Sequence, residues 1–383
     1  MPIAVLIFLV SALVLAYVIA GYPMVLALWR GAAPPIHKEF IPRSVSVLIV
    51  VHNGERSLRR KLESVLALDY PREQMEILVV SDGSTDGTDR IAQSFAPEGV
   101  RFLRVPRAGK ASALNAGIPL LSGEILVLTD VRQELAPDSL RHLVACFADP
   151  TVGTVSAELR ILPGEKREEA EMGLYWRYDV WIRTRMSEIG STFGANGPYY
   201  AMRRSLAASI APDTLLDDVT LPMHALYSGY RLILEPAANA YDFPTALNVE
   251  FRRKMRTLGG VWQIYWRDRR LLSAANPMRF HFASQKLARL LIPYALLGMT
   301  LPVFWFPDPW RATAVVSATA FYGLGLLDLI VPQRWFLKRL TSPVRSFLVM
   351  AAATLCAAAV FFVPPQRLWK VTAVSQPERS REG

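Results

Sequence analysis

The sequence predicts an α/β domain with a mixed, mainly parallel β-sheet, placed between apolar N- and C-terminal helices that span a membrane. Two observations predict this architecture. Short β-branched runs alternate along the middle of the chain with segments whose apolar residues recur at helical spacing. The apolar residues otherwise concentrate at the two ends of the 383-residue chain, which exceeds the roughly 250–300 residues at which single domains stop growing.

The composition excludes several classes of protein. With 52% hydrophobic and 20% charged residues, the chain is neither disordered nor a coiled coil. Cys146 and Cys356 are too few for a disulfide framework or a cysteine-built zinc site. The net charge of +10 would suit nucleic acid, but the basic residues flank the apolar segments and no nucleic-acid-binding fold is recognisable. We therefore expect a membrane partner and no nucleic acid.

The first expected transmembrane helix covers residues 1–30. No charged residue precedes Arg30, and the apolar run exceeds the roughly 20 residues that cross a bilayer. A signal peptide would begin with basic residues and have a shorter apolar stretch, so we expect this helix to be retained.

About three C-terminal transmembrane helices are expected within residues 287–366, at Leu287–Phe306, Ala312–Val331 and Ser346–Pro364. Asp328, in the second of them, should face protein or water instead of lipid. Residues 261–286 form an expected interfacial amphipathic region, because Trp262 and Trp266 are followed by a basic run at 267–270. Residues 367–383 form a basic tail.

The positions of the basic residues predict a multi-pass protein of the cell membrane with its central domain in the cytoplasm. Basic residues follow the first helix and precede the second, among them Arg30, Lys38, Arg43, Arg267 and Lys286. The tail is equally basic, whereas four complete spans would place it outside. A re-entrant late segment therefore stays open as an alternative.

The central domain is expected over residues 40–260. Its strands are expected at Ser46–Val51, Glu76–Val80, Val100–Val105 and Glu124–Thr129. Its helices are expected at Glu55–Ala67, Asp86–Phe95, Gly109–Ile118 and Pro137–Phe147. Ligands of such sheets bind beyond the carboxyl ends of the strands, so polar residues at those places are candidate site residues.

Asp82 and Lys110 are two such candidates. Asp82 follows the second strand in a glycine-containing turn, for which an ordinary Asx-rich turn is the alternative interpretation. Lys110 opens a helix whose N-terminus suits a diphosphate, although the spacing of a Walker loop is missing.

Three further carboxylates complete the set. Asp130 follows the fourth strand and could hold a divalent cation that bridges phosphates. Asp217 and Asp218 begin a later helix, where simple complementation of the helix dipole is the alternative.

These motifs follow one another as VSVLIVVHNGE, YPREQMEILVVSDGSTDGT, GKASALNAG, EILVLTD, GANGPYYAMRR and LDDVTLPMHALYSGYRL. Over about Val45–Arg256 the chain closely resembles the family 2 glycosyltransferases, inverting enzymes whose nucleotide-sugar-binding domain has the Rossmann-like GT-A fold. Its flanking helices resemble those of the membrane-embedded members, which are related to polysaccharide synthases.

The resemblance implies a role for each matching residue. Asp218 matches the catalytic base, and Asp217 stands beside it where glutamate is more usual. Asp82 would contact the uridine or its ribose. The whole implied donor-binding set is His52, Asn53, Glu55, Asp82, Lys110, Asn115 and Asp130, with Arg253 and Arg256 near the diphosphate. Gly194, Asn196 and Gly197 resemble the loop near the acceptor, and a glycine turn into a strand is the alternative.

The chain departs from the family pattern at two places. Asp130 matches the first aspartate of the metal-binding Asp-x-Asp element, but Val131 and Arg132 follow it. The resemblance still implies Mg²⁺ or Mn²⁺ at Asp130, with Arg132 near the phosphates. The Gln-x-x-Arg-Trp element of processive synthases is missing, which argues against processive synthesis.

We therefore expect a membrane glycosyltransferase that moves a sugar from a nucleotide sugar, with UDP as the expected nucleotide, to a lipid-linked or polysaccharide acceptor. Transfer would be a single inverting displacement with an aspartate as general base. A processive polysaccharide synthase and a non-catalytic membrane protein that binds a nucleotide sugar are the alternatives. Four aromatic residues would either stack on sugars or anchor the chain at the membrane surface: Tyr175, Trp176, Tyr178 and Trp181.

Overall fold

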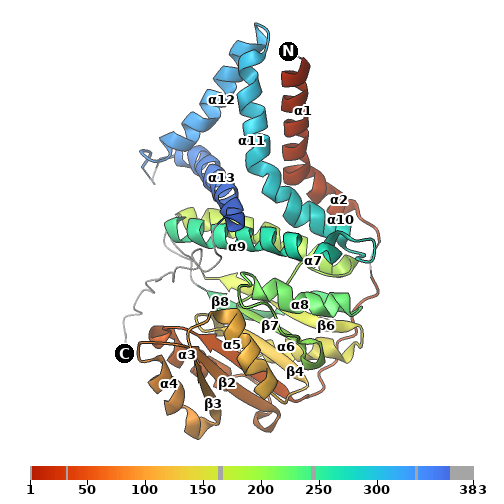
Figure 1. The fold of residues 1–383 in the computed structure, drawn as a ribbon, viewed down its shortest axis with the longest axis vertical. Coiled ribbons are helices and arrows are strands. Elements are labelled where there is room, and N and C mark those ends of the chain that lie inside the picture. The colour runs from red at the N-terminus through yellow and green to blue at the C-terminus, as the bar shows by residue number, and fades with distance from the viewer. Residues whose placement is uncertain (1, 32, 163–166, 243–246, 333–334, 363–383) are drawn as a thin grey trace. The chain divides into compact units, whose positions relative to one another are not determined.

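A computed structural model describes residues 2–31, 33–162, 167–242, 247–332 and 335–362 (Figure 1). The chain divides into two compact units. The first to be described comprises Arg30–Pro163 and Trp176–Pro244, and it contains the sheet. The second comprises Met1–Trp29, Gly164–Tyr175 and Thr245–Gly383. Residues 245–260, predicted as part of the central domain, group with the second unit.

The sheet unit has one eight-stranded sheet in its described part, in the order β3-β2-β1-β4-β7-β6-β8-β5. The strands are β1 (Val45–Val51), β2 (Met75–Asp82), β3 (Val100–Val105), β4 (Ile125–Asp130), β5 (Glu134–Leu135), β6 (Val152–Ile161), β7 (Tyr199–Arg203) and β8 (Arg231–Asp242). Strands β3, β2, β1 and β4 are parallel, and β7 runs antiparallel to β4 and β6. The predicted mixed, mainly parallel sheet is confirmed.

Helices cover both faces of this sheet. They are α3 (Glu55–Leu66), α4 (Thr88–Ser94), α5 (Lys110–Gly117), α6 (Ser139–Ala145), α8 (Asp217–Tyr227) and the part of α7 (Arg167–Ile189) from Trp176 on. Apolar residues at helical spacing in α3, such as Leu58 and Leu62, are buried in a core with the residues of α6. Leu114 of α5 and Leu221 of α8 belong to a second core cluster. Each helix expected between the first four strands is confirmed in type and place.

The register of the parallel strands brings the candidate site residues to one edge. Val51 pairs with Ser81, and Val50 pairs with Asp130. Because the strands are parallel, His52, Asp82 and Asp130 all leave the sheet at its carboxyl edge.

The described part of the second unit is helical. Its helices are α1 (Pro2–Ala16), α2 (Tyr22–Leu28), α9 (Leu247–Arg267), α10 (Arg279–Phe282), α11 (Ile292–Thr300), α12 (Trp310–Leu327) and α13 (Lys338–Ala357). Among the described residues, three stretches are long and apolar enough to cross a membrane: Pro2–Leu28, Arg279–Trp305 and Lys338–Phe361. The predicted span at 312–331 corresponds to α12, which is not one of them. The tail at 367–383 lies outside the described residues.

Asp328, at the end of α12, is buried among polar partners. Its carboxylate lies 3.0 Å from Nζ of Lys338, 2.6 Å from Oγ1 of Thr341 and 3.2 Å from a guanidinium nitrogen of Arg345. Only 1% of the residue is exposed. The expectation that this carboxylate faces protein instead of lipid is therefore confirmed.

Candidate active site

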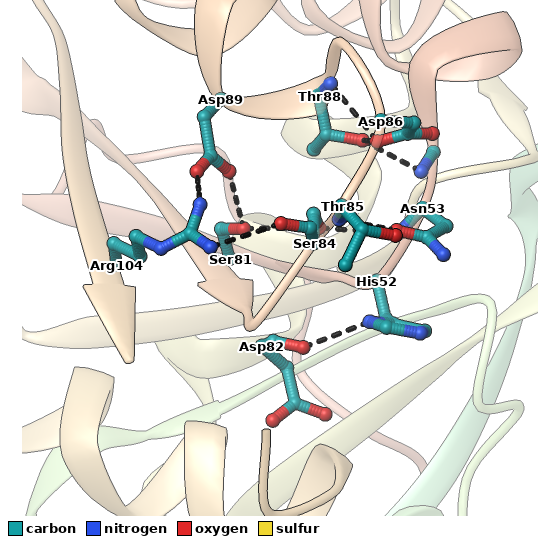
Figure 2. Close-up of polar contacts among 11 residues, drawn as sticks. His52, Asn53, Ser81, Asp82, Ser84, Thr85, Asp86, Thr88, Asp89 and Arg104 are labelled. Atoms are coloured by element: carbon teal, nitrogen blue, oxygen red, sulfur yellow. Dashed lines mark hydrogen bonds and ion pairs between the residues drawn. The ribbon is translucent and has the colours of Figure 1, made fainter. Parts of the chain in front are cut away.

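The loop after β1 is tied to the turn after β2 (Figure 2). Oδ1 of Asn53 accepts a hydrogen bond from the Thr85 amide at 2.8 Å, and the Asn53 amide donates to Oγ of Ser84 at 3.1 Å. Asn53 has a φ of 51°, a left-handed conformation that asparagine tolerates better than most residues. The two predicted donor-binding segments therefore form one rigid rim at the carboxyl edge.

Glu55 and Asp86 lock this rim reciprocally. Oε2 of Glu55 accepts from the Gly87 amide at 3.0 Å, while the Glu55 amide donates to Oδ2 of Asp86 at 3.1 Å. Burial alone would raise the pKa of Asp86, but hydrogen bonds from Thr88 and from the Glu55 amide hold it below its ordinary value. Both carboxylates thus shape the loop.

Asp82 anchors the loop that leads to Lys110. Its carboxylate pairs with Arg107 and accepts from the amides of Ala108 at 2.8 Å and Gly109 at 3.0 Å. Its backbone carbonyl accepts from Nδ1 of His52 at 2.8 Å. The contact of Asp82 with a nucleotide stays a prediction, while its role in placing the start of α5 follows from these bonds.

Lys110 lies between two of the predicted carboxylates. Its Nζ is 2.8 Å from Oδ1 of Asp130 and 2.9 Å from Oδ2 of Asp217. Burial would lower the pKa of Lys110, but Asp130, Asp217 and Asp218 together raise it above the ordinary value. The structure therefore brings a lysine that keeps its proton into contact with one carboxylate of β4 and one of α8, and Asp218 acts on it from further away.

The predicted acceptor-side loop packs against Asp218. Gly194 has a φ of 73°, and the Ala195 amide donates to the carbonyl of Asp218 at 2.8 Å. A Cβ atom on Gly197 would lie 2.7 Å from Oδ2 of Asp218. A side chain at position 197 would therefore collide with the predicted base.

Arg183 of α7 was not found by sequence reasoning. Its guanidinium pairs with Oδ1 of Asn196 and donates to Oγ of Ser156 at 2.9 Å. The Asn196 amide group donates in turn to the carbonyl of Ala157 at 2.5 Å. Nothing in the sequence marks Arg183, because α7 has no marked amphipathic pattern and its partners are distant along the chain.

Two predicted contacts differ in the structure. Both polar atoms of the Asn115 side chain bind the backbone of Ile210, at 2.7 and 3.0 Å, so this residue holds the chain before α8. Arg132, expected near the phosphates, instead pairs with Asp242 of β8, which is 2% exposed. A buried carboxylate needs a cationic partner, and Arg132 supplies it.

Four predicted residues cannot be added to this cluster. Arg253 and Arg256 lie on α9, in the second unit, and their role at the diphosphate stays a prediction. The side chains of Tyr175 and Trp176 lie outside the described residues.

The side chains available as metal ligands restrict how a metal could bind. In the part of the chain that the structure describes, no three His, Cys, Asp or Glu side chains gather as metal ligands. Asp130 is the one carboxylate of the predicted metal element, and Lys110 occupies its Oδ1. This set fits a hard cation bound through one carboxylate and substrate phosphates better than a preformed protein cage.

A known family matches part of the sheet unit. Residues 46–210 match the family model described as "Glycosyl transferase family 2". These residues form a family 2 glycosyltransferase domain. The match covers the segments that contain His52, Asp82, Lys110 and Asp130.

Two curated relatives of this glycosyltransferase domain have synthase names. The beta-monoglucosyldiacylglycerol synthase of Nostoc sp. is 28% identical over 239 residues, which cover 58% of this chain and 50% of that protein. The poly-beta-1,6-N-acetyl-D-glucosamine synthase of Staphylococcus aureus is 24% identical over 237 residues, covering 58% and 56%. The chain spans about half the length of these curated relatives.

A solved structure matches the fold of nearly the whole chain. The mannosyltransferase of Pyrobaculum calidifontis, determined with GDP-mannose and Mn²⁺, aligns with a TM-score of 0.72 at 23% identity. The alignment covers 92% of this chain and 98% of that one. The predicted GT-A fold is confirmed by this likeness.

Proposed function

We propose that this protein is an integral-membrane glycosyltransferase that moves a sugar from a nucleotide sugar, with UDP as the nucleotide, to a lipid-linked or glycan acceptor. The observation that carries the proposal is the contact of Lys110 with Asp130, both in the matched family 2 region, and with Asp217, which follows that region and precedes Asp218. The glycolipid and polysaccharide synthases among the relatives support the two classes of acceptor.

The proposed reaction is a single displacement with inversion. The acceptor hydroxyl attacks the anomeric carbon and forms the new glycosidic bond, while the bond from that carbon to the diphosphate oxygen breaks. Asp218 takes the proton of the hydroxyl, and the nucleoside diphosphate leaves with the bonding electron pair. The position of Asp218 against Gly197, in the acceptor-side loop, supports its role as base.

Lys110 would bind the diphosphate and stabilise the negative charge that develops on it. Asp217 and Asp130 both contact this ammonium and would orient it. Asp130 is also the residue that would hold Mg²⁺ or Mn²⁺. Such a cation, when bound, neutralises the charge of the departing diphosphate.

The membrane part of the proposal places the catalytic domain in the cytoplasm. Three apolar helices and the basic residues around the sheet unit support this orientation. If Arg279–Trp305 leads the chain out and Lys338–Phe361 leads it back, the basic tail lies on the same side as the domain. Two C-terminal crossings, instead of the predicted three, would place the tail with the domain, but they would put Lys338, Arg339 and Arg345 on the outer side, against the same charge rule.

A processive polysaccharide synthase is the second candidate, supported by the Staphylococcus aureus relative. The missing Gln-x-x-Arg-Trp element argues against it. Product length separates the two candidates, because a processive enzyme gives a ladder of long chains and a single-addition enzyme gives one glycolipid.

The test is a transfer assay on membranes that contain the full-length protein. Radiolabelled UDP-glucose, UDP-N-acetylglucosamine, UDP-galactose and GDP-mannose are supplied separately, and label is followed into the organic phase and into polymer. We expect label from one UDP-sugar in a single lipid product, and none with Asp218→Asn membranes. Absence of transfer with every donor would reject the proposal.

A further inference from the structure

We propose that Arg183 is a positioning residue for sugar transfer: it fixes the acceptor-side loop through Asn196 and keeps a positive charge beside the base, Asp218. The inference rests on the proposed function and adds a residue to that same site. It gives a role to α7, which the matched family region includes, and connects this helix to the acceptor-side loop before β7.

The hydrogen-bond partners of the Arg183 guanidinium are uncharged. Its partners are the amide oxygen of Asn196 and the hydroxyl of Ser156. Its Nε is buried without a partner, and 8% of the residue is exposed. Ser156 Oγ also accepts a hydrogen bond from the backbone amide of Asn196 at 2.8 Å, so Arg183, Ser156 and Asn196 form one closed cluster.

Burying a guanidinium on neutral partners is costly, and a neutral side chain could hold the same loop. The charge must therefore be offset by something further away. The acidic groups that attract Arg183 are Asp179, Asp218 and Glu158. Burial lowers the pKa of Arg183 and these acids oppose the shift, so the guanidinium remains a fixed cation.

Asp218 is the member of this acidic set that the acceptor-side loop contacts. Asn196, held by Arg183, immediately precedes Gly197, which packs against the Asp218 carboxylate. Lys110 and Tyr200 are among the other titratable groups that act with Asp218, and Tyr200 is kept neutral by burial. Asp217 is its neighbour in α8.

Arg183 would therefore affect both the position and the ionisation of the Asp218 carboxylate. A neighbouring cation favours the ionised form of a carboxylic acid, and only the ionised form of Asp218 can accept the acceptor's proton. Lys110 would serve the diphosphate, while Arg183 would act from the acceptor side, where it holds Asn196.

The test compares the pH dependence of kcat/KM for the wild type, Arg183→Gln, Arg183→Lys and Asn196→Asp, with the full chain in membranes and the donor identified by the transfer assay. In Arg183→Gln, we expect the acidic limb of the pH profile of kcat/KM to move to higher pH by about one unit. We also expect kcat to fall roughly 10–100-fold. Affinity for UDP should stay within about twofold, because Arg183 would not touch the donor. Arg183→Lys should restore the limb.

Asn196→Asp provides a second, independent test that leaves Arg183 in place. The added carboxylate neutralises the guanidinium, so the acidic limb should again move up. An unchanged limb in Arg183→Gln or in Asn196→Asp would overturn the proposal, as would identical profiles for Arg183→Gln and Arg183→Lys. A wild type that transfers no sugar at all would instead reject the proposed function.

Discussion

The ammonium of Lys110 lies 2.8 Å from Oδ1 of Asp130, joining the first residue of α5 to the last residue of β4. Asp217, the first residue of α8, is 2.9 Å from the same ammonium. One side chain thus connects α5 and β4, which are close along the chain, with the much later α8. Their common point lies at the carboxyl edge, where an α/β sheet binds its ligand.

Replacing Lys110 with methionine should remove this connection. Asp130 and Asp217 would then lose the cation that they share, and the diphosphate would lose a basic partner. We expect the rate of transfer to fall roughly 10²–10³-fold and UDP to bind more weakly. Lys38→Met is the control, because Lys38 pairs with Glu235 elsewhere in the same unit. Transfer at the wild-type rate in Lys110→Met would contradict the assignment.

Gly197→Ala should impair catalysis without unfolding the domain. The new methyl group would lie 2.7 Å from Oδ2 of Asp218 and must displace that carboxylate. We expect kcat to fall about tenfold or more, since small misplacements of a reacting group are costly. Gly323→Ala is the matched control, because no atom lies within 4 Å of a Cβ atom there. Equal activities of the two variants would refute this prediction.

Binding of Mn²⁺ should depend on the nucleotide. Asp130 is the only carboxylate of the predicted metal element, and Lys110 already contacts it, so the free protein should bind Mn²⁺ weakly. The diphosphate of UDP supplies the missing oxygen ligands. Electron paramagnetic resonance should show bound Mn²⁺ only after UDP is added, and Asp130→Asn should abolish the bound signal. Transfer that EDTA leaves unchanged would refute a role for the metal.

Lys61 should make the stability of the domain depend on pH. Only 1% of Lys61 is exposed, and its Nζ donates to Oγ1 of Thr129 at 2.5 Å and to the carbonyl of Gln133 at 2.8 Å. Burial lowers its pKa to about 7, against the attraction of Asp130 and Glu134. The unfolded chain then binds more protons than the folded one between about pH 7 and 10, so stability rises with pH in that window.

The measurement is the free energy of unfolding of the detergent-solubilised protein at about pH 7 and pH 9. The wild type should gain on the order of 1–3 kcal/mol relative to Lys61→Met over this interval. Lys38→Met should show no such trend. Burial would lower the pKa of Lys38, but Glu235 raises it above its ordinary value, so the proton is held throughout the interval. A pH-independent difference between the wild type and Lys61→Met would contradict the account.

The first four strands could be predicted because each is a short β-branched or apolar run followed by a polar turn. Val45–Val51 and Ile125–Asp130 show this pattern and pair directly in the sheet. The predicted order of strand ends also placed Asp82 and Asp130 at one edge. Local sequence was sufficient there, since parallel pairing follows from the alternation of strands and helices.

The roles of Arg183, Asn115 and Arg132 could not be predicted in the same way. Each depends on a partner that becomes a neighbour only in the fold: Asn196 for Arg183, Ile210 for Asn115 and Asp242 for Arg132. Periodicity reports which face of a helix is buried, and it carries no information on which polar group is buried with it. The motif around Asp130 therefore suggested a phosphate contact for Arg132 that the structure replaces with an ion pair.

The central claim is that Asp218 is the base of a sugar transfer. Its most direct test is the rate of sugar transfer from the labelled UDP-sugar by Asp218→Asn, measured beside the affinity of the same protein for UDP. We predict a loss of transfer of roughly 10²–10⁴-fold with UDP affinity within about twofold of the wild type. Transfer at the wild-type rate by Asp218→Asn would contradict the claim.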